Sequence, residues 1–104
     1  MKPLLCTMAL LFGSSALPQG PSTKGYMPPS GFVPDSATAV RIAVAVWIPI
    51  YGGAQIRSEQ PYVAKLSGDV WMVTGTLPRG SFGGIAEARI AKNDGRILFV
   101  IHSQ

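Results

Sequence analysis

The side chains that most often carry enzyme chemistry are sparse in this chain of 104 residues, which contains one Cys and one His. A Ser-His-Asp or Cys-His nucleophile needs a histidine as its base, and His102 is the only candidate. It closes the apolar run 97–101 near the end of the sequence, which is typical of a half-exposed residue at a strand end. Single Cys and His residues also exclude a disulfide framework and a zinc cluster of those two residue types.

Glu87 is the carboxylate best placed for acid–base chemistry, because it lies within the apolar stretch IAEARI. A lone carboxylate in an apolar cavity has a raised pKa and can act as a general base. Arg89 lies two residues further on and would share the same face of a strand, which favours a solvent-facing Glu–Arg pair. The other carboxylates are expected in structural roles: Asp35 as a helix cap, Asp69 and Asp94 in turns, and Glu59 in a loop.

The segment 75–81 has the glycine spacing of a phosphate-binding loop. It lacks the lysine that must follow the second glycine, and Pro78 removes one amide donor. We therefore interpret it as a strand–turn–strand passage. The Lys and Arg residues form no run, so nucleic-acid binding is not expected. These patterns together predict no catalytic residue, no cofactor and no metal.

Four aromatic side chains could either line a ligand pocket or fill the core. In a small domain, aromatic residues on a helix face and on strands more often belong to the core. The core is therefore favoured for this set, which comprises Trp47, Trp71, Phe82 and Phe99.

The elements that must position these side chains are one helix and four strands. A helix is predicted over 35–48, because Asp35 can cap its first turn and apolar residues recur at helical spacing from Val40 to Trp47. Pro49 would kink or end it. Strands are predicted over 62–66, 70–77, 82–91 and 96–102, with a hairpin turn at Asn93-Asp94-Gly95.

The last of these strands is almost continuously apolar, which predicts coverage on both faces or a central position in the sheet. The fold class is α+β: a small cone-like domain in which one main helix packs on a four-stranded, mostly antiparallel sheet.

The N-terminal residues have the layout of a secretory signal peptide. Lys2 precedes an apolar run, and Ser14-Ser15-Ala16 supplies small residues, so cleavage is predicted after Ala16. A helix packed on the domain is the alternative for residues 1–16. Residues 17–31 are rich in Pro and Gly and are predicted to be a linker. The protein is thus expected to be periplasmic or secreted, and no apolar run reaches the roughly 18 residues of a membrane-spanning helix.

The order of several motifs resembles a known family. Taken together, they are similar to the immunity proteins with a nuclear transport factor 2-like fold found in bacterial polymorphic toxin systems. The resemblance covers residues 32–102 and places an immunity domain over 32–104. Its motifs are FVPD at 32–35, Ala39 and Ile42-Ala43, WIPIYG at 47–52, PYVA at 61–64, DVWMVTGTLP at 69–78, Gly83-Gly84 and NDGRIL at 93–98.

The resemblance implies a binding protein, not an enzyme, that neutralises a cognate protein toxin by stoichiometric binding. It transfers no catalytic residue, and it leaves the toxin-binding residues and the oligomeric state open. The same cone fold also supports small-ligand binding or isomerase-like activity, so the fold alone does not decide. An enzyme requires a buried acid with a perturbed pKa in an open pocket, whereas a toxin binder requires an exposed apolar patch. An envelope protein with another partner is a third interpretation.

The charge of the chain bears on the kind of toxin. The net charge is +4, and it becomes +3 when Lys2 is lost with the signal peptide. Nuclease toxins are usually basic, and their inhibitors gain association rate from an acidic surface. A toxin that acts on the cell envelope is therefore expected.

Overall fold

The computed structural model describes residues 25–103. The predicted signal peptide, residues 1–16, lies outside the described residues, as do residues 17–24 of the predicted linker. The described elements are α2 (Ser36–Tyr51), α3 (Gly53–Arg57), β1 (Val63–Ser67), β2 (Val70–Thr74), β3 (Ala86–Ala91) and β4 (Ile97–His102).

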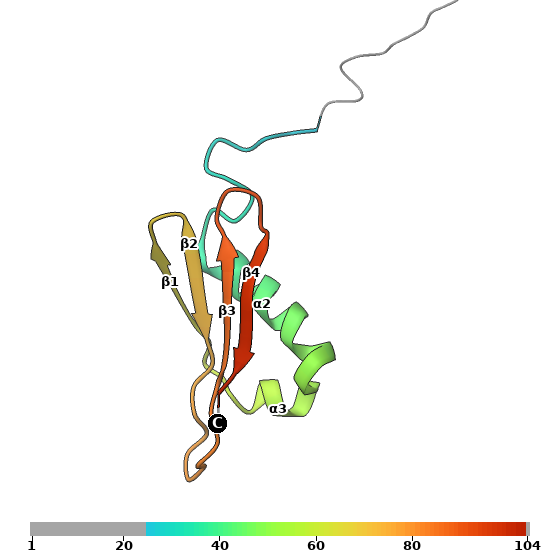
Figure 1. Cartoon of the computed structure of the whole chain (residues 1–104), viewed down its shortest axis with the longest axis vertical. Coiled ribbons are helices and arrows are strands. Elements are labelled where there is room, and N and C mark those ends of the chain that lie inside the picture. The colour runs from blue at the N-terminus through green and yellow to red at the C-terminus, as the bar shows by residue number, and fades with distance from the viewer. Residues whose placement is uncertain (1–24, 104) are drawn as a thin grey trace, which may run out of the picture.

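The four strands form one antiparallel sheet in the order β1-β2-β3-β4, so each strand pairs with its neighbour in sequence. The main helix, α2, lies across one face of this sheet, and α3 follows it beneath the lower end of the strands (Figure 1). The α+β prediction of one main helix on a four-stranded sheet is confirmed.

Asp35 caps α2 as the sequence predicts. Its Oδ1 accepts hydrogen bonds from the Thr38 amide at 2.8 Å and the Thr38 hydroxyl at 2.7 Å. These two bonds lower the pKa of Asp35. The helix continues through Pro49 to Tyr51, three residues beyond the predicted end, and stops at Gly52, whose φ of 93° favours glycine.

The predicted strands were too long on both sides of the connection between β2 and β3. β2 ends at Thr74 instead of residue 77, and β3 begins at Ala86 instead of residue 82. Residues 75–85 form a loop with a tight turn, in which the Ser81 amide donates to the Pro78 carbonyl at 3.0 Å. One proline and four glycines prevent this segment from continuing either strand.

The core lies between α2 and the sheet. Small residues of the helix and of β3, Ala39, Ala43 and Ala88, allow the two layers to approach closely around the fully buried Trp47 and Val73. Trp71 is also buried, and its Nε1 donates to the Val33 carbonyl at 2.8 Å. Its indole therefore joins the start of the folded chain to the sheet.

The core prediction holds for the two tryptophans and is wrong for the two phenylalanines. Phe82 is 100 % exposed and Phe99 is 42 % exposed. Phe82 lies in the loop instead of a strand, whereas Phe99 lies on the sheet face turned away from α2. Aromatic content alone could not distinguish the two faces.

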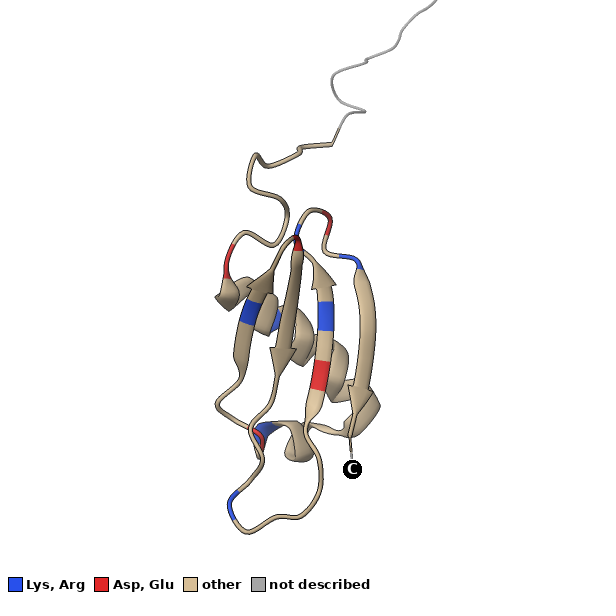
Figure 2. Ribbon diagram, turned by 60° about the vertical axis from the view of Figure 1, so that its left-hand side comes forward, with Lys and Arg blue, Asp and Glu red and all other residues tan. Residues whose placement is uncertain are grey.

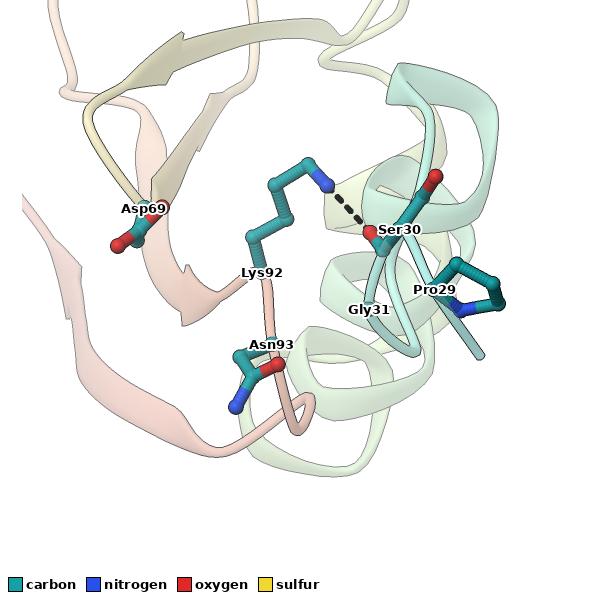
Figure 3. Close-up of a pocket in the computed structure, with 6 residues that line it drawn as sticks. All are labelled: Pro29, Ser30, Gly31, Asp69, Lys92 and Asn93. Carbon is teal, nitrogen blue, oxygen red and sulfur yellow. Dashed lines mark hydrogen bonds between the residues drawn. The ribbon is translucent and has the colours of Figure 1, made fainter. Parts of the chain in front are cut away.

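The chain enters the fold along the β3–β4 hairpin. The amides of Phe32 and Val33 donate to the carbonyls of Asn93 and Lys92 at 2.9 and 3.0 Å. The Lys92 ammonium donates to the Ser30 carbonyl, and both residues help to line a surface pocket of about 270 Å³ (Figure 3). Residues 30–33 are thus held against the hairpin before α2 begins.

We expect Trp71→Ala to lower the free energy of unfolding by about 3–5 kcal/mol, because it leaves a large cavity in a small core. The substitution also leaves the buried Val33 carbonyl without its donor. Chemical denaturation followed by circular dichroism measures the change. Phe82→Ala is the control and should stay within about 0.5 kcal/mol of the wild type, since Phe82 is fully exposed. Equal effects of the two substitutions would contradict this account of the core.

Candidate functional site

The one buried charged side chain among residues 25–103 belongs to Glu59, in the connection between α3 and β1. Its Oε1 accepts from the Ala86 amide at 2.8 Å, and its Oε2 accepts from Gln55 Nε2 at 2.9 Å. Its Oε2 also lies 2.7 Å from His102 Nε2. The carboxylate therefore joins the short helix α3 to the start of β3 and the end of β4.

His102 turns its ring inward from the end of β4. The side chain is only 17 % exposed, and its ring packs against Tyr51 with 5.1 Å between centroids. The expectation of a half-exposed strand-end residue is therefore corrected, because the end of β4 lies over Glu59 and α2. The second ring nitrogen, Nδ1, lies 3.2 Å from the Ser103 carbonyl oxygen.

The surroundings of Glu59 favour its ionised form. Burial is the largest single influence and raises the pKa of Glu59, but the bonds from Gln55, Ala86 and His102 together outweigh it. The pKa of Glu59 therefore lies below its ordinary value of 4.5. Nearby, burial and the Glu59 charge raise the pKa of Tyr62, whose hydroxyl donates to the Ile56 carbonyl at 2.8 Å.

A pocket of about 520 Å³ opens beside this network. Gln55, Ser58 and His102 line it on one side, and loop residues from Leu77 to Gly84 line it on the other. A small molecule in this pocket would meet the His102 ring but not the carboxylate of Glu59, which is fully buried. Both ring nitrogens of His102 already face oxygen atoms of the protein, and the pair thereby bridges the end of β4 to the segment that follows α3.

The other carboxylates predicted from the sequence lie where expected. Glu87 and Arg89 form a pair on the outer sheet face, with 2.8 Å between Oε2 and Nε. The Asp94 carboxylate accepts from the backbone and the guanidinium of Arg96 within the hairpin turn. Asp69 lies in the turn between β1 and β2, where its carbonyl accepts from the Lys92 amide at 2.8 Å.

The importance of Glu59 was not apparent from the sequence, which indicated only a loop residue. Two of its three partners, Ala86 and His102, are 27 and 43 residues away. No local spacing marks such a residue, because the bonds form only when the sheet brings distant segments together. No group of three or more His, Cys, Asp or Glu residues suited to a metal ion occurs within residues 25–103.

No described helix covers the sheet face turned away from α2, and Figure 2 shows this face in front of the helix. Two cross-strand rows of side chains cross it. The rows are Lys65, Met72, Arg89 and Phe99, and Val63, Thr74, Glu87 and Ile101. The first row carries charges on β1 and β3, the second on β3 alone, and both end in an apolar residue on β4.

Comparison with protein families decides the identity of this fold. A model of the NTF2 fold immunity proteins matches residues 38–104, which span α2 except for its first two residues, α3 and all four strands. The chain belongs to the NTF2 fold immunity protein family. Comparisons with curated proteins and with solved structures gave no significant match.

Membership of this immunity family confirms the resemblance found in the sequence. It gives the protein a general role in immunity against a toxin, and it implies a toxin as the partner. It also favours a non-enzymatic role. None of the described helices has both the length and the apolar character needed to cross a membrane.

We expect Glu59 to make the free energy of unfolding decrease at acidic pH. Because its pKa is lower in the folded chain, its stabilising effect is complete above about pH 4.5, the ordinary value, and is lost as the pH falls below it. Glu59→Gln should remove this dependence and cost on the order of 1–3 kcal/mol at neutral pH, since an amide donor replaces an acceptor. Unfolding free energies measured from pH 7 to pH 3 test both expectations.

The matched control is Glu87→Gln, the same substitution on the outer sheet face. Its ion pair with Arg89 is partly exposed, and such pairs contribute about 0–1 kcal/mol. If both variants lose stability equally and keep the same pH profile, the central role of Glu59 is wrong.

Proposed function

We propose that this immunity protein is exported and neutralises its toxin by forming a stoichiometric complex. The family match supports a toxin as partner, and the apolar residues exposed on the outer sheet face support binding as the mode of action. Met72, Phe99 and Ile101 are each about two-fifths exposed on that face. Apolar groups of this kind, bordered by charged residues, are typical of protein interfaces.

The alternative of a ligand-binding or isomerase-like protein needs a buried acid that opens into a pocket. The structure does contain a buried acid and a neighbouring pocket, but Glu59 is enclosed and both of its oxygens accept hydrogen bonds. The geometry therefore favours the binding protein over the enzyme.

The charge distribution supports a partner recognised mainly through apolar contacts and hydrogen bonds. Charged residues make up 13 % of the chain, and those in the centre of the outer face, Glu87 and Arg89, neutralise each other. A basic nuclease would gain little from such a surface. We infer a toxin that acts on the cell envelope, such as a cell-wall hydrolase or a membrane-active domain.

Export follows from the N-terminal sequence pattern. An immunity protein must be present in the compartment where its toxin acts, and the predicted signal peptide, residues 1–16, would deliver this one to the periplasm or the exterior. Export and an envelope-acting toxin are therefore two parts of one proposal.

The complex should be 1:1 and only weakly dependent on salt. Isothermal titration of this protein with the toxin encoded beside its gene gives both quantities. We expect the Kd to change by less than about tenfold between roughly 50 and 500 mM salt, because few charged residues are available for long-range attraction. A cytoplasmic nuclease as partner, or binding that is lost at high salt, would refute the charge argument.

The mature protein should begin at Leu17. Intact-mass measurement on protein from a cell-envelope fraction should show the loss of residues 1–16. A variant with Leu10→Arg, which interrupts the apolar run, should remain full-length in the cytoplasm and serves as the control. Recovery of the wild-type chain from the cytoplasm at full length would contradict export.

A further inference from the structure

The two edges of the sheet differ in how they are protected from other strands. A charged residue, a proline or a covering element usually prevents an exposed edge strand from pairing with other chains. β1 has Lys65 at its centre, facing outward. β4 is an edge as well, but its first five residues, Ile97 to Ile101, contain no charge and no proline.

This position corrects the prediction made for the last strand. Its continuous apolar run indicated coverage on both faces or a central place in the sheet, yet β4 pairs with β3 alone and no described element covers its outer face. Ile97, Leu98, Phe99 and Ile101 are each about two-fifths exposed. The sequence of a buried strand therefore occupies an uncovered edge in the described structure.

The backbone of β4 also has free hydrogen-bonding groups. The Ser103 amide donates to the Ile85 carbonyl across the β3–β4 pairing. In an antiparallel strand, the amide and carbonyl of one residue point to one side and those of the next residue to the other. Since the Ser103 amide points toward β3, the backbone amides and carbonyls of His102 and Val100 point toward the open edge. A strand from another chain could pair with these groups and cover Phe99 and Ile101 at the same time.

The end of this edge is held in a fixed position. The His102 ring lies on Glu59, and Ser103 is bonded to Ile85. On the outer face, the Arg89 guanidinium lies 4.8 Å from the centre of the Phe99 ring and is paired with Glu87. A rigid, preformed strand loses little conformational entropy when a partner binds.

We propose that the toxin docks on β4 and adds an extended, uncharged segment of its own as a fifth strand of the sheet. This inference rests on the proposed function, because the immunity family supplies the toxin as partner. The charge distribution supports an uncharged partner segment. Glu87 and Arg89 neutralise each other beside β4, so we expect the added toxin strand to place apolar side chains against Phe99 and Ile101. A second copy of this chain is the competing occupant, and the test separates the two.

The experiment compares Ile101→Lys with Val63→Lys in the full chain. Ile101 and Val63 belong to the same cross-strand row on the same face, at opposite edges, and are 42 % and 43 % exposed. A lysine should therefore affect folding similarly at both positions, which thermal unfolding verifies. We expect Ile101→Lys to weaken binding of the toxin encoded beside the gene by about 100-fold or more, and Val63→Lys by less than about threefold.

Hydrogen exchange on the wild-type complex gives a second readout that needs no variant. The amides of Val100 and His102 should become protected when the toxin binds, while those of β1 should not change. Equal loss of affinity in both variants, or new protection only at β1 or in loop 75–85, would overturn the inference.

The oligomeric state and the wild-type titration distinguish the remaining outcomes. A free protein that is dimeric by light scattering and becomes monomeric with Ile101→Lys would show that a second copy occupies β4, which also overturns the inference. If the wild type binds the toxin and Ile101→Lys binds equally well, docking on β4 is wrong but the proposed function stands. If the wild type does not bind the toxin, the proposed function itself fails.

Discussion

The buried carboxylate of Glu59 is the interaction on which the lower end of this fold depends. Its oxygens form hydrogen bonds with Gln55 in α3, with Ala86 at the start of β3 and with His102 at the end of β4. A buried charge is costly unless its oxygens accept hydrogen bonds. Because three donors supply them here, this charge holds α3 against the start of β3 and the end of β4.

The glycines around this network follow from the close approach that it requires. A Cβ atom at Gly75 would lie 2.5 Å from Glu59 Oε1, and one at Gly84 would lie 1.6 Å from the Ser103 carbonyl oxygen. Side chains at these positions would separate the loop from the body of the protein. The loop 75–85 therefore begins and ends close to Glu59 and Ser103, and Gly75 and Gly84 reflect this close packing.

In the proposed complex, the toxin binds to the outer face and the β4 edge of the sheet. A single helix can cover only one face of a four-stranded sheet, so the other face and both edges are left for partners or for solvent. Lys65 protects one edge, and the pair of Glu87 and Arg89 neutralises the centre of the face. The apolar residues of β4 are what remains. Under this proposal, a small domain obtains a stable core and a binding surface from the two faces of one sheet.

The sequence by itself determined the features that depend on neighbouring residues. Asp35 as a cap, the hairpin turn at Asn93-Asp94-Gly95, the α+β class and the family resemblance all rest on local patterns, and the structure and the family match confirm them. The tertiary structure alone decided the rest. The pairing of Glu59 with His102 joins residues 43 apart, and the edge position of β4 depends on strand order. Neither has a local signal, because a strand's own residues do not specify how many neighbours it will have.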